Sequence, residues 1–396
     1  MTGLKNDKKM VPNIRFKGFT DDWEQRKLST FADRFDNLRE PITAGKRVNG
    51  DIPYYGANGI QDYVDGYTHD GDFLLIAEDG ASDLSNYPVR RVNGKVWVNN
   101  HAHVVAGKMD AADNGFLSNS FKTINIEPFL VGGGRAKLNS DVMMKLEFKL
   151  PEYQEQKEIG SLLDKVDNVL TLHQRKLEGL EKLKKLLLQK MFPQNGESVP
   201  ELRFSGFTDD WEQRKLGELT TWSKGFELSK DKLNSEGVGS KALHYADLYK
   251  FKPVERDVIH WTTSEEGYDL KSNSLLFPMS DVTSVGLART SYLTDNSVKI
   301  GGDVLIAELN KDTEAGFLSY QINAVPNKII PFVTGTTIRH INSKSLSKII
   351  YSITGTQEQK QIETILLSLG SLITLHQRKL EKLESVKKSL LQNLFV

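Results

Sequence analysis

Two segments of this chain occur twice, and they divide the sequence into two similar halves. The segment Val11–Leu28 reads VPNIRFKGFTDDWEQRKL, and Val199–Leu216 matches it at fifteen of eighteen positions. The segment Thr171–Phe192 reads TLHQRKLEGLEKLKKLLLQKMF, and Thr374–Phe395 matches it at sixteen of twenty-two positions. Self-similarity over such distances indicates a repeated structural unit. We therefore expect each half to contain a short head, a divergent block and a shared terminal segment.

The divergent blocks, residues 29–153 and 217–356, share only short stretches. GFLS begins at Gly115 and again at Gly316, and IEPF at Ile126 corresponds to IIPF at Ile329. The constant order of these stretches indicates one fold that carries two different surfaces.

Both blocks also contain short apolar runs bounded by Gly and Asn, which are typical of strands. These runs lie at 73–77, 96–105, 274–278, 303–307 and 328–333. The predicted fold class is α+β, with two globular mixed α/β domains joined by two long antiparallel coiled-coil helices in a duplicated, pseudo-twofold organisation. The expected layout is a flexible tail at 1–10, a globular domain at 11–153, a helix at 154–192, a linker at 193–198, a second globular domain at 199–356 and a second helix at 357–396.

The shared terminal segments predict two long helices. No proline occurs between Gln154 and Phe192, and apolar residues recur at alternating steps of four and three. An average spacing of 3.5 residues is typical of a coiled-coil seam. The predicted seam positions are Ile159, Leu163, Val166, Leu170, His173, Leu177, Leu180, Lys184, Leu187 and Met191 in the first helix, and Ile362, Leu366, Leu369, Ile373, His376, Leu380, Leu383, Lys387, Leu390 and Leu394 in the second.

A helix with one apolar seam needs a partner. The other copy is the obvious partner, in an intramolecular antiparallel pair; the alternative is that each helix dimerises with another protein. His173 and His376 are expected to pack in the seam or to hydrogen bond across it, because a metal site would need further ligands that the segment lacks. Lys184 and Lys387 are expected to set the register as polar seam residues.

Composition excludes several classes of protein. The chain has 396 residues and no cysteine, which excludes a disulfide scaffold, a thiolate zinc site and a cysteine nucleophile. No apolar run is long enough to span a membrane, and the polar N-terminus does not resemble a secretory signal. We expect no membrane partner and a cytoplasmic location.

Catalytic signatures are absent from the sequence. It contains no G-x-x-x-x-G-K-[ST], no G-x-S-x-G and no H-E-x-x-H. The Asn-Pro-Pro or Asp-Pro-Pro of an amino-methyltransferase and the Pro-Asp start of many nuclease sites are also missing. His101 and His103 lack a third ligand nearby. The sequence therefore predicts a binding and scaffolding protein with no catalytic and no metal-ligating residues.

The repeated motifs carry a family resemblance. FxGFTDDWEQRKL opens each half, and EQK with TLHQRKLExL marks each terminal helix. This pattern, over essentially the whole chain, resembles the specificity subunit of a type I restriction-modification enzyme. The resemblance implies that the two blocks are target recognition domains, each of which reads one half of a split, asymmetric sequence in double-stranded DNA. It further implies that the helices set the spacing between the halves.

Partners and cofactors also follow from the resemblance. It implies that the chain docks two methyltransferase subunits, which methylate adenine N6, and two restriction subunits, which translocate and cut DNA. S-adenosylmethionine, ATP and magnesium would be bound by those partners and not by this chain. The alternative from another class is a coiled-coil adaptor between proteins without DNA specificity.

Candidate DNA contacts are residues whose side chains can read base edges in the major groove. They are Tyr55, Asn58, Gln61, Arg90, Arg91, Arg135 and Lys137 in the first block, and Lys224, Lys230, Lys250, Arg289, Lys328 and Arg339 in the second. Arg90 and Arg91 are the strongest pair, since adjacent arginines in an expected polar loop have no obvious partner.

The distribution of charge qualifies this hypothesis. The chain has 52 basic and 52 acidic residues, and the two divergent blocks are slightly acidic. DNA-binding proteins usually present basic surface. We therefore expect a local basic patch on each block and a substantial contribution of partner subunits to phosphate binding.

Overall fold

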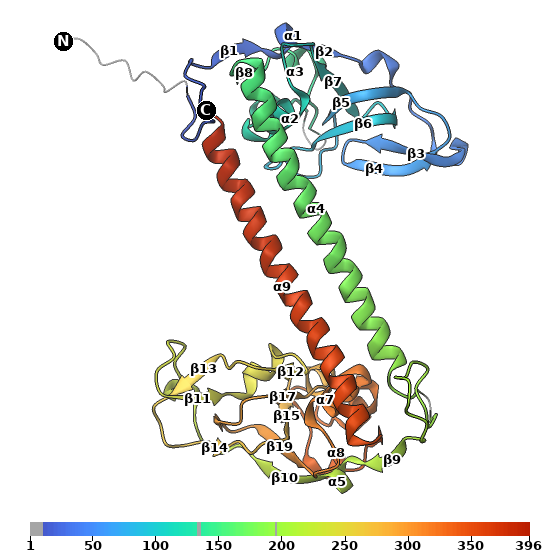
Figure 1. The fold of residues 1–396 in the computed structure, drawn as a ribbon, viewed down its shortest axis with the longest axis vertical. Coiled ribbons are helices and arrows are strands. Elements are labelled where there is room, and N and C mark those ends of the chain that lie inside the picture. Colours follow the sequence, from blue (N-terminus) through green and yellow to red (C-terminus); the bar gives the residue numbers. More distant parts are fainter. Residues whose placement is uncertain (1–10, 133–135, 195) are drawn as a thin grey trace, which may run out of the picture. The chain divides into compact units, whose positions relative to one another are not determined.

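The computed structural model describes residues 11–132, 136–194 and 196–396. The expected tail at 1–10 and the candidate Arg135 lie outside the described residues. The chain forms two compact units, whose elements are labelled in Figure 1. Unit 1 contains the chain up to Arg175 together with Arg378–Val396, and unit 2 contains Lys176–Gln377. Each unit therefore holds one repeated head, one divergent block and a part of each long helix.

Unit 1 is built around a six-stranded sheet (Figure 1). Its strands in spatial order are β2 (Ala32–Arg34), β7 (Ala102–Gly107), β5 (His69–Ala77), β6 (Val89–Val98), β3 (Asn49–Gly56) and β4 (Gly59–Val64). Neighbouring strands are antiparallel except β3 and β6. The prediction of one strand at 96–105 is wrong: the chain turns at residues 99–101, so this run ends β6 and begins β7.

The remaining elements of unit 1 surround this sheet. Strand β1 (Glu24–Lys27) from the repeated head pairs antiparallel with β8 (Glu147–Leu150). The helices are α1 (Leu28–Phe31), α2 (Asn114–Thr123) and α3 (Ser140–Met143), with 3-10 turns at Asp36–Leu38, Ala44–Lys46 and Glu127–Phe129. The GFLS stretch lies in α2, which begins after Asp113, whose side chain caps the helix by accepting from the Phe116 N–H.

Unit 2 contains two larger sheets. One has the order β10 (Thr220–Lys224), β19 (Val304–Leu309), β15 (Ser274–Pro278), β17 (Ser291–Leu293) and β12 (Val254–Glu255). The other has the order β13 (His260–Thr262), β11 (Ser240–Leu243), β18 (Val298–Ile300) and β14 (Tyr268–Asp269). The strands expected at 274–278 and 303–307 are confirmed as β15 and β19.

Short elements complete unit 2. Two-stranded ladders join β16 (Ser280–Asp281) to β20 (Arg339–His340) and β9 (Glu212–Lys215) to β21 (Ile350–Ile353). The helices are α5 (Leu216–Leu219), α6 (Ser284–Leu287), α7 (Ala315–Ala324) and α8 (Ser343–Leu346), with 3-10 turns at Lys230–Lys232, Tyr245–Tyr249, Pro326–Lys328 and Ile330–Phe332. The strand expected at 328–333 is wrong, because Pro326 and Pro331 lack the N–H groups of a ladder and the chain forms two 3-10 turns instead.

The repeated segments form the same aromatic core in each unit. In unit 1, Trp23 of the head packs edge-on against Phe116 of α2 and against Phe395. In unit 2, the corresponding Trp211 packs edge-on against Phe192 and tilted against Phe317 of α7. The head, the GFLS helix and the end of a long helix are therefore retained in both halves because their side chains bury one another.

A repeated buried ion pair fixes each head to a long helix. Arg15 donates two hydrogen bonds of 2.8 Å to Glu155, whose side chain is fully buried. Arg203 makes the same pair with Glu358 in unit 2. Each glutamate lies in the first turn of its helix, where the helix dipole also favours a negative charge.

The two long helices are α4 (Tyr153–Lys190), with 38 residues, and α9 (Thr356–Leu394), with 39. At 1.5 Å per residue each is about 57 Å long. All twenty predicted seam positions are buried or half-buried, including the two lysines. The start of one helix and the end of the other pack in the same unit, as an antiparallel pair requires: Ile159 and Leu163 share the core of unit 1 with Leu394.

Among the described residues, no helix is both long enough and apolar enough to cross a membrane.

The seam lysines of the two units have different environments. Lys387 forms an ion pair with Asp167 in unit 1. In unit 2 the residue that corresponds to Asp167 is Gly370, and the Lys184 ammonium lies 3.4 Å from the position of a Cβ there. Burial, together with the nearby Lys252, lowers the pKa of Lys184. This half-buried ammonium therefore lacks the carboxylate that its counterpart has.

We predict that Gly370→Asp stabilises unit 2. The new carboxylate should pair with Lys184 as Asp167 pairs with Lys387, and the loss of a helical glycine adds to the gain. The expected increase in the free energy of unfolding is about 1 kcal/mol. Urea denaturation measures it, with Gly370→Asn as the uncharged control. An equal gain for both variants would show that helix propensity alone is responsible.

Candidate nucleic-acid interface

The first candidate surface is the hairpin of β3 and β4 in unit 1. Tyr55 is only 8% exposed and packs in a core cluster with residues of β5, β6 and β7, so little of its side chain is accessible to a ligand. Its contact with DNA stays a prediction. Asn58 lies exposed at the turn, but its amide is engaged: it donates to the Gly80 carbonyl at 2.9 Å and accepts from the Ser82 N–H at 2.8 Å. Asn58 therefore joins this turn to the loop that follows β5.

Two further candidates lie beside this turn. Gln61 is exposed and accepts a long hydrogen bond of 3.4 Å from Asn99. Arg90 is exposed, and its guanidinium lies 3.3 Å from the position of a Cβ on Gly59, whose φ is +122°. The glycine thus makes room for the arginine. Among the described residues, Arg90 forms no ion pair, so its charge is available to a ligand.

Arg90 and Arg91 have opposite environments. They lie in strand β6 and not in the expected loop, and adjacent residues of a strand point to opposite faces. Arg91 donates to both carboxylate oxygens of Asp72 at 2.8 and 2.7 Å and to Asp164 of α4 at 2.6 Å. Its hydrogen bonds to Asp72 raise its pKa. The prediction that Arg91 is unpaired is therefore wrong, because it holds the sheet against α4.

Lys137 is also engaged within unit 1. Its ammonium lies 2.8 Å from Glu78, which also pairs with Arg39 at 2.6 Å. Burial alone would raise the pKa of Glu78, but hydrogen bonds from Lys137 and Arg39 bring it below its usual value. Lys137 was predicted as a candidate DNA contact, and that role stays a prediction; in this conformation its ammonium is paired with Glu78.

His103 completes this charged cluster. Its ring is 1% exposed, with Nδ1 at 2.7 Å from the Asp36 carboxylate and Nε2 at 2.8 Å from the Leu138 carbonyl. Both ring nitrogens therefore contact hydrogen-bond acceptors, one on the side chain of Asp36 and one on the backbone of Leu138. Burial opposes ionisation of Asp36, but its hydrogen bond from His103 contributes to a net lowering of its pKa.

Three candidates of unit 2 lie around one tyrosine. Arg289 is half-buried and donates to the carbonyls of Tyr249 and Phe251 at 2.9 and 2.8 Å, and burial lowers its pKa. Both terminal nitrogens of Arg289 thus bond the backbone, while its Nε is buried without a partner among the described residues. Base reading by Arg289 stays a prediction, for which this conformation leaves few donors accessible. Lys250 is exposed beside Tyr249, whose hydroxyl donates to the Ser280 carbonyl at 2.6 Å.

The ladder of β16 and β20 then brings Arg339 opposite Asp281, next to Ser280. The half-buried Arg339 makes a weak bond of 3.3 Å to the Gly335 carbonyl. Lys250 follows Tyr249, whose hydroxyl bonds to Ser280, and Arg339 lies opposite the next residue, Asp281. The structure therefore places Lys250 and Arg339 in the same region of unit 2.

The other candidates of unit 2 lie elsewhere. Lys224 is exposed, 3.9 Å from Asp303. Lys230 is exposed in a 3-10 turn. Lys328 donates to the Ile350 carbonyl at 2.9 Å and lies over the ring of Tyr351. The structure therefore does not gather these three lysines with Lys250 and Arg339.

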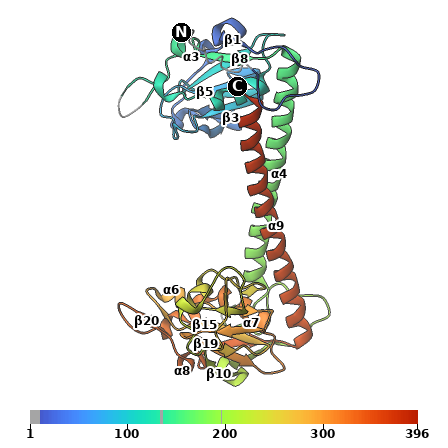
Figure 2. The same ribbon diagram turned by 90° about the vertical axis from the view of Figure 1, so that its left-hand side faces the viewer.

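The structure also reveals a surface that the search for polar side chains missed. Val282 follows β16, Ile338 precedes β20, and Val285 lies in α6, which packs on both strands. These side chains are 73%, 54% and 67% exposed. Figure 2 shows α6 and β20 on the same side of unit 2. Apolar side chains can contact the thymine methyl group, a role that no charge or amide pattern in the sequence would indicate.

Metal binding has no support among the described residues, where no group of three or more His, Asp or Glu side chains is placed to hold an ion. The paired His101 and His103 instead contact the carboxylates of Asp79 and Asp36.

Comparison with known sequences identifies the family. The model of the type I restriction modification DNA specificity domain matches residues 20–182 and, separately, residues 208–385. The chain belongs to this family. The two matches coincide with the two halves that the repeats define, so each half is one specificity domain with part of a long helix.

Known specificity subunits are similar over different lengths. A putative type I restriction enzyme specificity subunit of Haemophilus influenzae is 42% identical over 161 residues, which are 41% of this chain and only 41% of that protein's own length. A type I restriction enzyme specificity subunit of Methanocaldococcus jannaschii is 22% identical over 406 residues, covering 94% of this chain and 91% of the relative.

A solved structure shows the same fold. The crystal structure of the type I restriction-modification system S subunit from M. genitalium matches with a TM-score of 0.69 and 14% identity, covering 98% of this chain and 99% of that one. The predicted fold class of two mixed α/β domains and two long helices is confirmed.

We predict that acid destabilises unit 1 through its charged cluster. Asp36 and Glu78 have lowered pKa values in the fold, so their stabilising contribution is present above the unfolded pKa values near 4 and is lost as the pH falls through the folded ones. The free energy of unfolding should decrease below about pH 4.5. Denaturation across this range measures it. Asp36→Asn should flatten the dependence, whereas the exposed control Asp33→Asn should not.

Proposed function

We propose that this chain is the DNA-reading subunit of a type I restriction-modification complex. Each unit reads one half of a bipartite, asymmetric target in double-stranded DNA. The chain itself catalyses nothing. With two methyltransferase subunits it directs adenine N6 methylation, and with two restriction subunits it directs ATP-dependent cleavage.

The observation that carries this proposal is the double family match on one scaffold with two different surfaces. Both units keep the buried Trp–Phe cluster and the Arg–Glu pair. The exposed edges differ: unit 1 presents Arg90 beside the Asn58 turn, and unit 2 presents Lys250, Arg339 and exposed valines. A constant scaffold with variable edges suits a protein that reads two different half-sites.

The long helices support a role in spacing and assembly. A helix of about 57 Å exceeds the ~34 Å that separates half-sites one turn apart on DNA. Apolar residues outside the seam are exposed on both helices at corresponding positions: Leu172 and Leu375 are 66% and 47% exposed, and Val169 and Leu372 are 41% and 45% exposed. We propose that these repeated apolar positions receive the two methyltransferase subunits.

Cofactors belong to the partners in this proposal. S-adenosylmethionine would be bound by the methyltransferase subunits, and ATP and magnesium by the restriction subunits. The chain contributes recognition, and the absence of catalytic signatures in its sequence is consistent with that division.

The second candidate is an adaptor that joins proteins through its helices without reading DNA. The exposed apolar positions of α4 and α9 favour it equally. It differs in one respect: it assigns no sequence-reading role to Arg90 or to the edge of unit 2.

We predict that Arg90→Ala changes methylation while Arg91→Ala changes stability. Arg90 is exposed and unpaired within the described chain, so its loss should leave folding intact but weaken or relax recognition at one half-site by about 1–3 kcal/mol. Arg91 joins Asp72 to Asp164, so its loss should destabilise unit 1. Long-read mapping of adenine methylation in cells, with and without the chain, measures the first effect, and thermal unfolding measures the second.

Three results would contradict different parts of this proposal. Methylation that is the same with and without the chain would refute the proposed function itself. Unchanged methylation in Arg90→Ala, together with normal stability, would remove Arg90 from the interface. Loss of both half-sites in a folded Arg90→Ala protein would show that the two units do not read independently.

We also predict that the helices set the DNA spacer. One extra heptad in each helix, inserted after Gly179 and after Lys382, keeps the seam in phase. A Cβ at Gly179 would have no described atom within 4 Å outside its own turn of helix, so this side of α4 is open and the insertion should be tolerated. Seven residues add about 10.5 Å of helix, or about three base pairs at 3.4 Å each. Methylation mapping should show unchanged half-sites with a longer spacer, and an unchanged spacer contradicts the prediction.

A further inference from the structure

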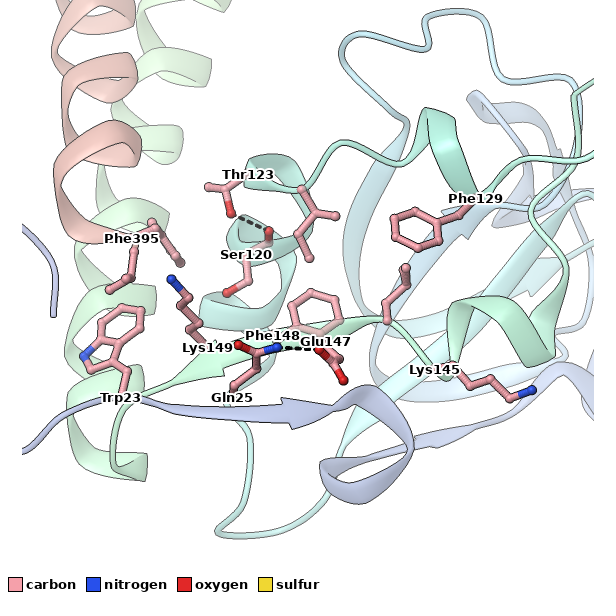
Figure 3. Close-up of a pocket in the computed structure, with 13 residues that line it drawn as sticks. Trp23, Gln25, Ser120, Thr123, Phe129, Lys145, Glu147, Phe148, Lys149 and Phe395 are labelled. Atoms are coloured by element: carbon pink, nitrogen blue, oxygen red, sulfur yellow. Dashed lines mark hydrogen bonds between the residues drawn. The ribbon is translucent and has the colours of Figure 1, made fainter. Parts of the chain in front are cut away.

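Unit 1 contains a cavity of about 430 Å³ between α2, the β1–β8 ladder and the end of α9. Figure 3 shows the side chains that line it. Aromatic rings of Phe129, Phe148 and Phe395 and the indole of Trp23 form much of its wall, with Ser120 of α2 and Lys149 of β8 among the polar residues. The cavity is therefore large enough for a ring-sized molecule and has both apolar and polar walls.

The hydroxyl of Ser120 is an unsatisfied polar group of this wall. Ser120 is 4% exposed, and its hydroxyl is buried without a hydrogen-bond partner among the described residues. Figure 3 shows this hydroxyl directed toward the strand that carries Lys149. A buried hydroxyl without a partner costs free energy, which a ligand in the cavity would recover. The Trp23 Nε1 is also unpaired, but so is Trp211 in unit 2, so it does not distinguish the two units.

The free edge of β8 supplies two further groups. The Leu28 N–H donates to the Leu146 carbonyl at 2.9 Å, and the register places Gln25 opposite Lys149. Hydrogen-bonded and non-hydrogen-bonded pairs alternate along an antiparallel ladder. The Gln25–Lys149 pair is therefore of the second kind, and the backbone N–H and C=O of Lys149 point away from β1. Within the described part of the chain, neither group has a partner.

In unit 2, the corresponding strand edge has a hydrogen-bond partner. There the register is the same, with Leu216 bonded to Ile349 and Gln213 opposite Ser352. The residue that corresponds to Ser120 is Gln321, whose side-chain amide donates to the Ser352 carbonyl at 2.9 Å and accepts from the Ser352 N–H at 3.2 Å. A primary carboxamide from α7 thus satisfies both groups of the strand edge.

Serine is too short to do the same in unit 1. The strand edge at Lys149 retains its donor and acceptor, the cavity occupies the place of the missing amide, and the Ser120 hydroxyl remains unpaired. We propose that this cavity binds a small molecule that carries a primary carboxamide on a flat apolar ring. The carboxamide pairs with the N–H and C=O of Lys149 and with the Ser120 hydroxyl, and the ring packs between the aromatic side chains.

Calorimetric titration of the full-length protein with benzamide tests the proposal. We expect saturable binding with a stoichiometry of one. N,N-dimethylbenzamide has no N–H to donate, and benzoate replaces the amide by a charge, so both should bind about tenfold more weakly or not at all. If the titration with benzamide shows no saturable binding, the cavity holds only water and the proposal is overturned. Equal affinity for benzamide and N,N-dimethylbenzamide also overturns it.

Variants locate the site. Ser120→Gln should place its own amide on the Lys149 edge, as Gln321 does in unit 2, and abolish benzamide binding. Ser120→Ala removes only the hydroxyl and should weaken binding about fivefold. Gln321→Ser, the matched change in unit 2, should leave the benzamide affinity of unit 1 unchanged. Undiminished binding in a folded Ser120→Gln protein contradicts the assignment, and if that variant does not fold, Ser120→Ala and N,N-dimethylbenzamide still decide.

Discussion

Each unit depends on a buried ion pair between its repeated head and the first turn of a long helix. Glu155 and Glu358 are essentially inaccessible to water, and each is held by an arginine in bidentate geometry. Removing one partner of such a pair leaves an uncompensated buried charge, which costs about 3–5 kcal/mol. The head also supplies the edge strand and the tryptophan of the aromatic core. The pair therefore fixes the direction in which a helix leaves its globular block.

Internal ion pairs engage many charged side chains of the divergent blocks. Arg91 pairs with Asp72 and Asp164, and Lys137 and Arg39 pair with Glu78. The buried His103 also contacts the Asp36 carboxylate, at 2.7 Å. The net charge of a block therefore does not show where its exposed cations, such as Arg90 and Lys250, lie. A protein that reads DNA from such a surface would depend on partner subunits for much of its phosphate attraction.

Comparison of the two units is informative because the chain contains its own control. The sheets of the two units differ, but both units keep the repeated head, the aromatic cluster and the Arg–Glu pair. Differences next to these shared parts can therefore be related to single local changes. Asp167 and Gly370 differ in whether a seam lysine has a carboxylate partner. Ser120 and Gln321 differ in whether a strand edge is satisfied from within. Neither difference involves a residue of the aromatic cluster or of the buried Arg–Glu pair that the units share.

The sequence by itself determined the duplication, the seam and the family. Those features are periodic or repeated, and the hydrophobic spacing of a helix follows directly from its geometry. It also placed β15 and β19, whose apolar runs are short and bounded by polar residues. It did not place the strand ends at 96–105, because the reversal there depends on pairing with strands distant in sequence. The turns at 328–333 follow from Pro326 and Pro331, a local signal that the apolar pattern alone overlooks.

Only the tertiary structure decided the fate of individual candidate residues. The sequence does not distinguish the adjacent Arg90 and Arg91. Because neighbouring residues of a strand face opposite sides, Arg90 is exposed to solvent, whereas Arg91 pairs with two carboxylates that are distant in the chain. Tyr55 and Arg289 are likewise assigned to the interior by packing. The exposed valines beside β20 and the unfilled strand edge at Lys149 have no signature in the sequence. Their exposure depends on contacts that exist only after the chain has folded.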